Sequence, residues 1–225
     1  MKKNRNFTLV ELLTVIGIIV VLAGILIPAV NSAMKKAHET ACASNLRQLG
    51  IAEKGYSTEN KNLMLHCGGS GEYNKGGKNQ NDTWADRLYD YANDKKIFIC
   101  PEANEDGTCT TQINGSSNTS DSEDKLTYVA NPGKSDTPDK TVHPSAKSLK
   151  PVKVYQIVRA SQVISLGPQN DSDKDSSLVA NYKTSSHLTP DRHLGKRANY
   201  LMVDGHVESI DKTALTDDHF QKTTN

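Results

Sequence analysis

Residues 7–30 read FTLVELLTVIGIIVVLAGILIPAV, an apolar run with one charged side chain, Glu11. The uncharged part, from Leu12 to Val30, would cover roughly 28 Å as an α-helix, which is enough to span the hydrocarbon core of a bilayer. A short basic segment precedes the run and contains Lys2, Lys3 and Arg5. Because positive charges favour the cytoplasmic side of a membrane, we expect this segment inside the cell and the rest of the chain outside.

The helical pattern continues beyond the apolar run. A secretory signal peptide would end in a small-residue cleavage site after its apolar core. Residues 31–33, Asn-Ser-Ala, are a weak match to such a site. Helical periodicity instead persists to about Tyr56, where Gly55 and the polar run 57–62 end it. The sequence therefore predicts one long helix, with a transmembrane part over 7–30 and an amphipathic continuation over 31–56.

Glu11 stands out because a carboxylate at the edge of an apolar span costs a few kcal/mol unless a partner compensates its charge. A positive charge at the same depth would compensate it. The free amine of Phe7 on a neighbouring copy of the chain is such a charge. The alternative interpretation is a plain membrane anchor with an incidental glutamate.

The segment Phe7-Thr8-Leu9-Val10-Glu11 behind a basic stretch resembles the cleavage and methylation motif of type IV prepilins and type II secretion pseudopilins. The resemblance implies that a prepilin peptidase cuts between Asn6 and Phe7 and methylates the new amino terminus, so that residues 1–6 are a leader. It implies that Glu11 aligns incoming subunits and that Pro28 kinks the helix. Asn6 stands where the family usually has glycine.

Residues 57–225 predict an extracytoplasmic globular domain with short strands. Asp204-Gly205 separates two alternating segments, 199–203 and 206–210, which is a strong hairpin signal because both turn positions favour positive φ. Further strand patterns lie at 96–100, 126–130, 152–158 and 162–166, and short helical patterns at 82–93 and 213–221. The expected fold class is α+β: a pilin-like long N-terminal helix packed on a small antiparallel sheet.

The C-terminal half extends the resemblance. Residues 98–101 read Phe-Ile-Cys-Pro, and ten residues, 194–203, separate His193 from Asp204-Gly205. These features resemble a bacterial pseudopilin subfamily with an H-x9-DG signature, from which this chain differs by one residue of spacing. We expect His193 to hydrogen-bond to the backbone of the hairpin.

Four cysteines in a chain with an export-type N-terminus favour two disulfides. Cys42 lies on the helix face that should meet the sheet, and Cys100 ends an apolar segment expected on the same face. We therefore expect a Cys42–Cys100 bond, and a Cys67–Cys109 bond between two loops. The main competing connectivity joins Cys100 to Cys109 and Cys42 to Cys67. Four free, buried thiols are the other alternative.

Signals for metal binding or catalysis are weak. The side chains considered as metal ligands are His187, His193, Asp204 and His206, and their spacing does not bring them together. Alternating carboxylates like those of a calcium loop stand at Asp171, Asp173 and Asp175. They lack the glycine and the bidentate glutamate of such a loop. No G-x-S-x-G, nucleotide-binding loop or H-E-x-x-H occurs, so we expect no metal, no cofactor and no enzymatic activity.

The expected function is structural. A net charge of +1 gives no electrostatic reason to expect a nucleic acid as partner. The resemblance implies a type II secretion pseudopilin or type IV pilus-like subunit, held in the bacterial inner membrane with its globular domain in the periplasm. Its partners would be a prepilin peptidase, sister subunits and the assembly machinery. The alternative is a membrane-tethered module that binds a surface ligand such as a glycan, for which Glu11 would not be needed.

Overall fold

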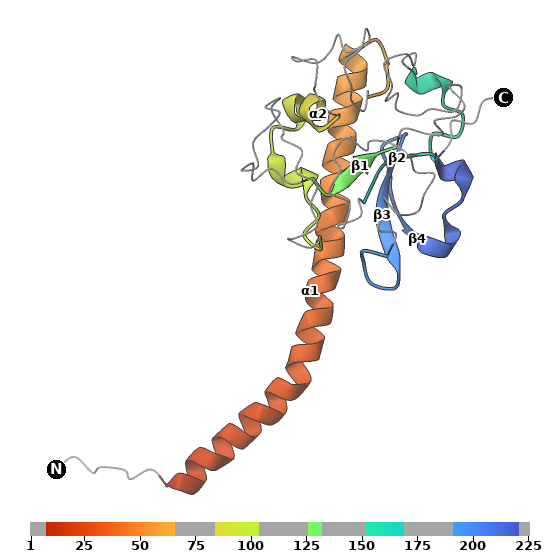
Figure 1. Ribbon diagram of the computed structural model, residues 1–225. Helices are drawn as coiled ribbons and strands as arrows, with labels where there is room; N and C mark the ends of the chain where they lie inside the picture. Colours follow the sequence, from red (N-terminus) through yellow and green to blue (C-terminus); the bar gives the residue numbers. More distant parts are fainter. Residues whose placement is uncertain (1–7, 66–83, 104–125, 132–151, 169–190, 221–225) are drawn as a thin grey trace, which may run out of the picture. The chain divides into compact units, whose positions relative to one another are not determined.

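The structure is a computed structural model of the chain, and it describes residues 8–65, 84–103, 126–131, 152–168 and 191–220. The chain divides into two compact units, Met1–Ala37 and His38–Asn225. We call the second unit the head. Figure 1 shows the elements of both units, coloured along the sequence.

Helix α1 (Leu9–Glu59) is continuous over 51 residues. It begins with a capping box, in which Thr8 and Glu11 satisfy each other's main-chain N–H groups. Pro28 lies inside the helix, where it removes one main-chain donor. The predicted long helix is confirmed, and it extends to Glu59 rather than ending near Tyr56.

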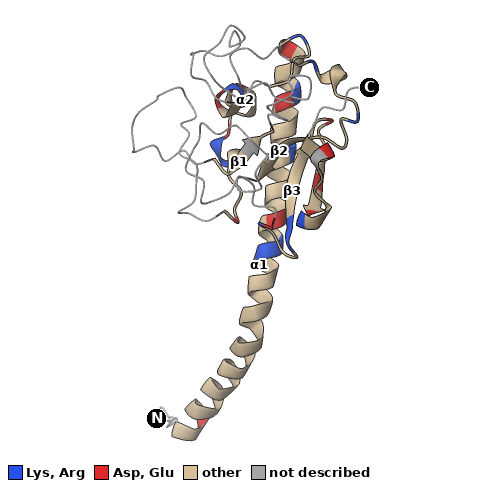
Figure 2. Cartoon of the chain, turned by 45° about the vertical axis from the view of Figure 1, so that its right-hand side comes forward, with Lys and Arg blue, Asp and Glu red and all other residues tan. Residues whose placement is uncertain are grey.

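In the first unit, the large apolar side chains of α1 are exposed. The helix carries no charged residue between Glu11 in its first turn and Lys35, and Figure 2 shows this stretch in tan. None of its most apolar 18-residue window is buried within the chain. By length and composition this stretch can cross a membrane, which supports membrane anchoring.

Helix α2 (Trp84–Ala92) packs beside the end of α1. It confirms the helical pattern expected within 82–93, and it buries Trp84 and Leu88. Tyr91 meets Tyr56 of α1 edge-on, with ring centroids 6.0 Å apart. The aromatic pair therefore joins α2 to α1.

The sheet has four antiparallel strands in the order β1-β2-β3-β4. The strands are β1 (Tyr128–Ala130), β2 (Ile164–Pro168), β3 (Arg197–Met202) and β4 (Val207–Asp211). The predicted hairpin is confirmed: β3 pairs with β4, and Gly205 in the turn has a φ of +94°. The α+β class, a long N-terminal helix on a small antiparallel sheet, is confirmed as well.

The main core of the head lies between α1 and this sheet. Leu46 and Leu49 of the helix and Leu166 and Leu201 of the strands are fully buried in one cluster. A Cβ atom on Gly50 would lie 2.8 Å from Cδ1 of Leu201. Glycine at this position therefore lets helix and sheet approach closely.

Two predicted strands are wrong. Residues 96–100 begin instead within the 3₁₀ turn η1 (Lys95–Phe98), because the side chain of Asp94 accepts from the Lys96 N–H at 2.9 Å and caps the turn. Residues 152–158 contain the 3₁₀ turn η3 (Val154–Gln156), in which Gln156 Oε1 accepts from the Lys153 N–H at 3.0 Å. In both segments the apolar residues mark burial, and a local turn replaces a full strand; at its start the second segment makes a single antiparallel bridge, between Lys153 and Leu63.

The predicted C-terminal helix is two 3₁₀ turns, η4 (Lys212–Ala214) and η5 (Asp217–Phe220). Asp211 caps the first of them by accepting from the Thr213 N–H at 2.8 Å. An α-helix would need a longer run of i to i−4 bonds, and this cap favours a tight turn instead.

Candidate functional site

The first candidate is the N-terminal turn of α1. The carboxylate of Glu11 accepts from the Thr8 N–H at 2.9 Å and from the Thr8 hydroxyl at 2.8 Å. The Thr8 hydroxyl in turn accepts from the Glu11 N–H at 3.2 Å. Acidic side chains are favoured in a first helical turn because they face the positive end of the helix dipole. Glu11 therefore has a local role that the sequence analysis missed, although the pattern Thr-x-x-Glu signals it.

This local role leaves one carboxylate oxygen available. Both bonds from Thr8 end on Oε2 of Glu11. Within the described part of the chain, Oε1 has no hydrogen-bond partner. Asn6 and Phe7, the predicted cleavage site, lie outside the described residues. Glu11 can therefore cap its own helix through Oε2 and still pair with a positively charged group through Oε1.

The second candidate is a buried cluster of Cys42, Cys100 and His193, which we call the CCH cluster. One ligand atom from each residue lies within 4.8 Å of the others. The Sγ of Cys100 is 3.9 Å from Nε2 of His193. The three residues are 0 %, 1 % and 5 % exposed, respectively.

Three separate segments build the CCH cluster. Cys42 projects from α1, Cys100 follows η1, and His193 precedes β3. The Cys100 N–H donates to the Thr127 hydroxyl at 2.5 Å, and the His193 N–H donates to the Arg197 carbonyl at 2.8 Å. These bonds fix both segments beside the sheet. The bond from His193 to the start of β3 comes from its main chain, whereas its ring faces Cys100 and its Nδ1 has no hydrogen-bond partner among the described residues, so the predicted bond from the His193 side chain to the hairpin backbone is not found.

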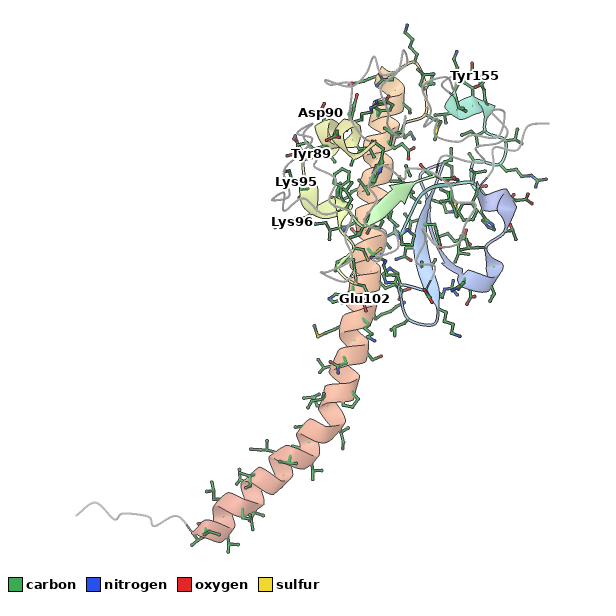
Figure 3. The ribbon with its side chains drawn as sticks, viewed as in Figure 1. Tyr89, Asp90, Lys95, Lys96, Glu102 and Tyr155 are labelled. Atoms are coloured by element: carbon green, nitrogen blue, oxygen red, sulfur yellow. The ribbon has the colours of Figure 1, made fainter. Side chains whose placement is uncertain are left out.

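Neighbouring groups close the cluster. The Tyr128 hydroxyl donates to Sγ of Cys42 at 3.1 Å. Two residues beyond Cys100, Glu102 reaches back to α1, where its Oε2 lies 2.8 Å from Nδ1 of His38; Figure 3 labels Glu102 beside the helix. The cluster is therefore enclosed between the helix, β1 and the segment that follows η1.

The pKa values of the two thiols shift in opposite directions. A hydrogen bond from Cys42 lowers the pKa of Cys100, with smaller contributions from His193 and the charge of Arg192, while burial opposes the shift. The same hydrogen bond, together with burial, raises the pKa of Cys42. The arrangement favours a thiolate on Cys100, and thiolates are nucleophiles and metal ligands.

The structure places the predicted cysteine pair together but does not join it. Cys42 and Cys100 lie side by side, and both are free thiols rather than the expected disulfide. A disulfide needs the sulfur atoms about 2.05 Å apart. Here the His193 ring and the Tyr128 hydroxyl also contact the sulfur atoms. Cys67 and Cys109 lie outside the described residues, so the second predicted bond stays a prediction.

The other candidate ligands do not join the CCH cluster. Asp204 and His206 pair with each other in the hairpin turn, where Oδ1 and Nδ1 are 2.6 Å apart. His193 points instead to the cysteines. The remaining candidates, His187, Asp171, Asp173 and Asp175, lie outside the described residues.

The third candidate is a cavity of about 290 Å³ beside a buried acid. Glu53 is 8 % exposed, and the Ser165 hydroxyl lies 2.8 and 2.7 Å from its two carboxylate oxygens. Burial raises the pKa of Glu53 to about 7. Gly50, Ser57, Met64, Val203 and Gly205 also line the cavity. Glu53 lies four residues after Leu49 and three before Tyr56, on the buried face of α1, so its helical spacing is the signal that could have identified it.

No family model, curated protein or solved structure matches the chain.

Proposed function

We propose that the chain is a structural subunit of a type II secretion pseudopilus or a type IV pilus-like filament. The observation that carries the proposal is helix α1, which is unbroken from the Thr8–Glu11 turn to the core of the head. Its first part is apolar and exposed, and its last part supplies Leu46 and Leu49 to the head's core. One element thus serves as anchor and as scaffold.

In this proposal the exposed apolar side chains of the first unit have two successive environments. Before assembly they lie in the hydrocarbon core of the inner membrane, with residues 1–6 in the cytoplasm and the head in the periplasm. After assembly they pack against the same helix of neighbouring subunits. Both environments exclude water, so the transfer between them requires little change in apolar exposure.

Glu11 would set the position of an incoming subunit along the helices of its neighbours. A prepilin peptidase would cut between Asn6 and Phe7 and leave a positively charged amine, methylated, on Phe7. Oε2 of Glu11 caps its own helix through Thr8, which leaves Oε1 to meet the amine of a neighbouring subunit. An ion pair in a medium that excludes water is strong, so a misplaced subunit would bury an unpaired charge.

The experiment is to express the full chain together with a prepilin peptidase and a pilus-type assembly machinery, and to shear filaments from the cells. We expect the processed chain in the sheared fraction, and crosslinking there should give a ladder of multimers. Recovery of the chain only as a processed monomer in the membrane would contradict the proposal.

A second function, a membrane-tethered binding module, is favoured by one observation: the cavity beside Glu53. A volume of about 290 Å³ lies at the small end of the range for small-molecule sites. A chain that binds a ligand there as a monomer would depend on the residues of the cavity and would tolerate changes at Glu11. The sheared-filament experiment therefore separates the two functions.

A further inference from the structure

We propose that the CCH cluster is a binding site for a soft, thiophilic metal ion with a filled d shell, Zn²⁺ or Cu⁺. The three ligand atoms would come from Cys42, Cys100 and His193. The site would join helix α1 to the segment that follows η1 and to the segment that precedes β3.

The spacing of the ligand atoms carries the proposal. In a tetrahedral zinc site with Zn–S near 2.3 Å and Zn–N near 2.0–2.1 Å, the ligand atoms lie roughly 3.5–3.8 Å from one another. The observed distance from Cys100 Sγ to His193 Nε2 is 3.9 Å, and no pair exceeds 4.8 Å. Small side-chain adjustments close such a site, whereas a disulfide has no use for the third side chain.

The orientation of His193 is a second, independent observation. The residue is 5 % exposed, and among the described residues its Nδ1 is buried without a hydrogen-bond partner. Its Nε2 faces Sγ of Cys100. Without a metal, Nε2–H can donate to Sγ of Cys100; with the ring proton on Nδ1 instead, Nε2 would offer its lone pair to an ion held by the two sulfur atoms.

The chemistry of the ligands selects the ion. Thiolate sulfur and imidazole nitrogen favour Zn²⁺ or Cu⁺, whereas Mg²⁺ and Ca²⁺ prefer oxygen ligands. Two thiolates neutralise the charge of Zn²⁺, so a divalent ion can be buried here without a net charge. The Tyr128 hydroxyl, 3.1 Å from Sγ of Cys42, supplies the kind of outer hydrogen bond that orients a ligand.

Three protein ligands fit both ions in different ways. Cu⁺ can be bound by the three ligands alone, whereas Zn²⁺ adds a fourth ligand such as water. Either ion would tie the helix to the sheet while leaving the thiols unoxidised. The role is structural because the site is enclosed and binding energy of the ion adds to the stability of the folded head.

The decisive variants are His193→Ala and a matched control, His206→Ala, in the full-length chain. His193 is part of the cluster, whereas His206 lies exposed in the hairpin turn. His193→Ala keeps both cysteines, so it removes a metal ligand and leaves a disulfide possible. The proteins are purified in detergent with a reductant and without chelator, and their bound zinc and copper are measured.

We expect about one equivalent of zinc or copper in the wild type and in His206→Ala, and at least tenfold weaker binding in His193→Ala. The identity of the bound element distinguishes the two ions. Co²⁺ substitution of the wild type should give sulfur-to-cobalt charge-transfer absorption, which Cys42→Ser and Cys100→Ser weaken.

A further measurement needs no variant. Added Zn²⁺ or Cu⁺ should protect Cys42 and Cys100 of the wild type from alkylation and raise its Tm, and a chelator should reverse both effects. Wild type that binds neither ion under these conditions would overturn the proposal. The same holds if peptide mapping without reductant finds a Cys42–Cys100 disulfide in metal-free native protein, or if metal binding is unchanged in a folded His193→Ala variant.

Discussion

The hydroxyl of Ser165 on β2 bridges both carboxylate oxygens of Glu53 on α1, at 2.8 and 2.7 Å. The contact joins helix to sheet inside the head, where Glu53 is 8 % exposed. Burial disfavours the charged form of the carboxyl group and raises its pKa to about 7, although the hydrogen bond from Ser165 opposes the shift. The head therefore holds an acid whose protonation changes near neutral pH.

The first prediction is that Glu53 makes the head less stable as pH rises. The unfolded chain ionises this group near 4.5 and the folded head near 7, so the folded state binds more protons between these values. The free energy of unfolding must then fall as pH rises from 4.5 to 7, by up to about 3 kcal/mol. Below this window the group carries no such penalty, and above it the penalty is complete.

Glu53→Gln isolates this contribution because it keeps the size of the side chain and an acceptor for Ser165. Denaturant unfolding at pH 5 and pH 8 should show a smaller loss of stability in the variant than in the wild type, and the variant should be the more stable protein at pH 8. Equal pH dependence in the two proteins would show that the folded head does not raise the pKa of Glu53.

The second prediction concerns processing. Cleavage between Asn6 and Phe7 removes three basic residues, so the formal net charge falls from +1 to 1 − 3 = −2 before the new amine is counted. Intact-mass analysis of the membrane-purified protein should find a chain that begins at Phe7 and carries one added methyl group. A mature chain that still begins at Met1 would rule out the peptidase step.

The third prediction separates the two roles of Glu11. Glu11→Gln keeps the acceptor that the capping box needs but loses the charge, so insertion and helix formation should persist while filament incorporation fails. Thr8→Ala loses the cap, at a local cost of about 1 kcal/mol, and keeps the charge. We expect this second variant to assemble.

Crosslinking of sheared filaments measures both variants, and Glu59→Gln at the other end of α1 controls for the loss of a carboxylate from the same helix. Normal multimers with Glu11→Gln would disprove charge pairing. Failure of Thr8→Ala to assemble, with Glu11→Gln unaffected, would instead assign the motif to helix capping.

The sequence predicts correctly the elements that depend on residues close together in the chain. The long helix follows from its unbroken periodicity, and the β3–β4 turn follows from Asp204-Gly205, since Gly205 takes positive φ in the structure. Residues 96–100 and 152–158 were mistaken for strands because apolar content reports burial rather than pairing. Whether a buried segment pairs depends on strands elsewhere in the chain, which a local pattern does not contain.

In the candidate sites, too, local patterns do not identify partners that come from distant segments. The helix face of Cys42 was readable from periodicity, and its approach to Cys100 followed from the expected packing of helix on sheet. The third member, His193, is 93 residues from Cys100 in sequence, and only the path of the chain before β3 brings it there. The buried position of Glu53 can be read from its helical spacing, but its partner Ser165 belongs to a distant strand that no local pattern identifies.

The last prediction concerns the closest approach of α1 to the sheet. A Cβ on Gly50 would lie 2.8 Å from Cδ1 of Leu201, whose side chain is fully buried and has little room to move. Gly50→Ala should therefore destabilise the head by about 1 kcal/mol, because overpacking outweighs the gain of about 1 kcal/mol that alanine gives a helix.

Leu201→Ala alone should cost about 2–5 kcal/mol through the cavity it leaves. In the double variant the new methyl group occupies part of that cavity, so the combined loss should be smaller than the sum by at least about 0.5 kcal/mol. Denaturant unfolding of the four proteins gives this coupling directly, and strictly additive losses would mean that the two residues do not meet.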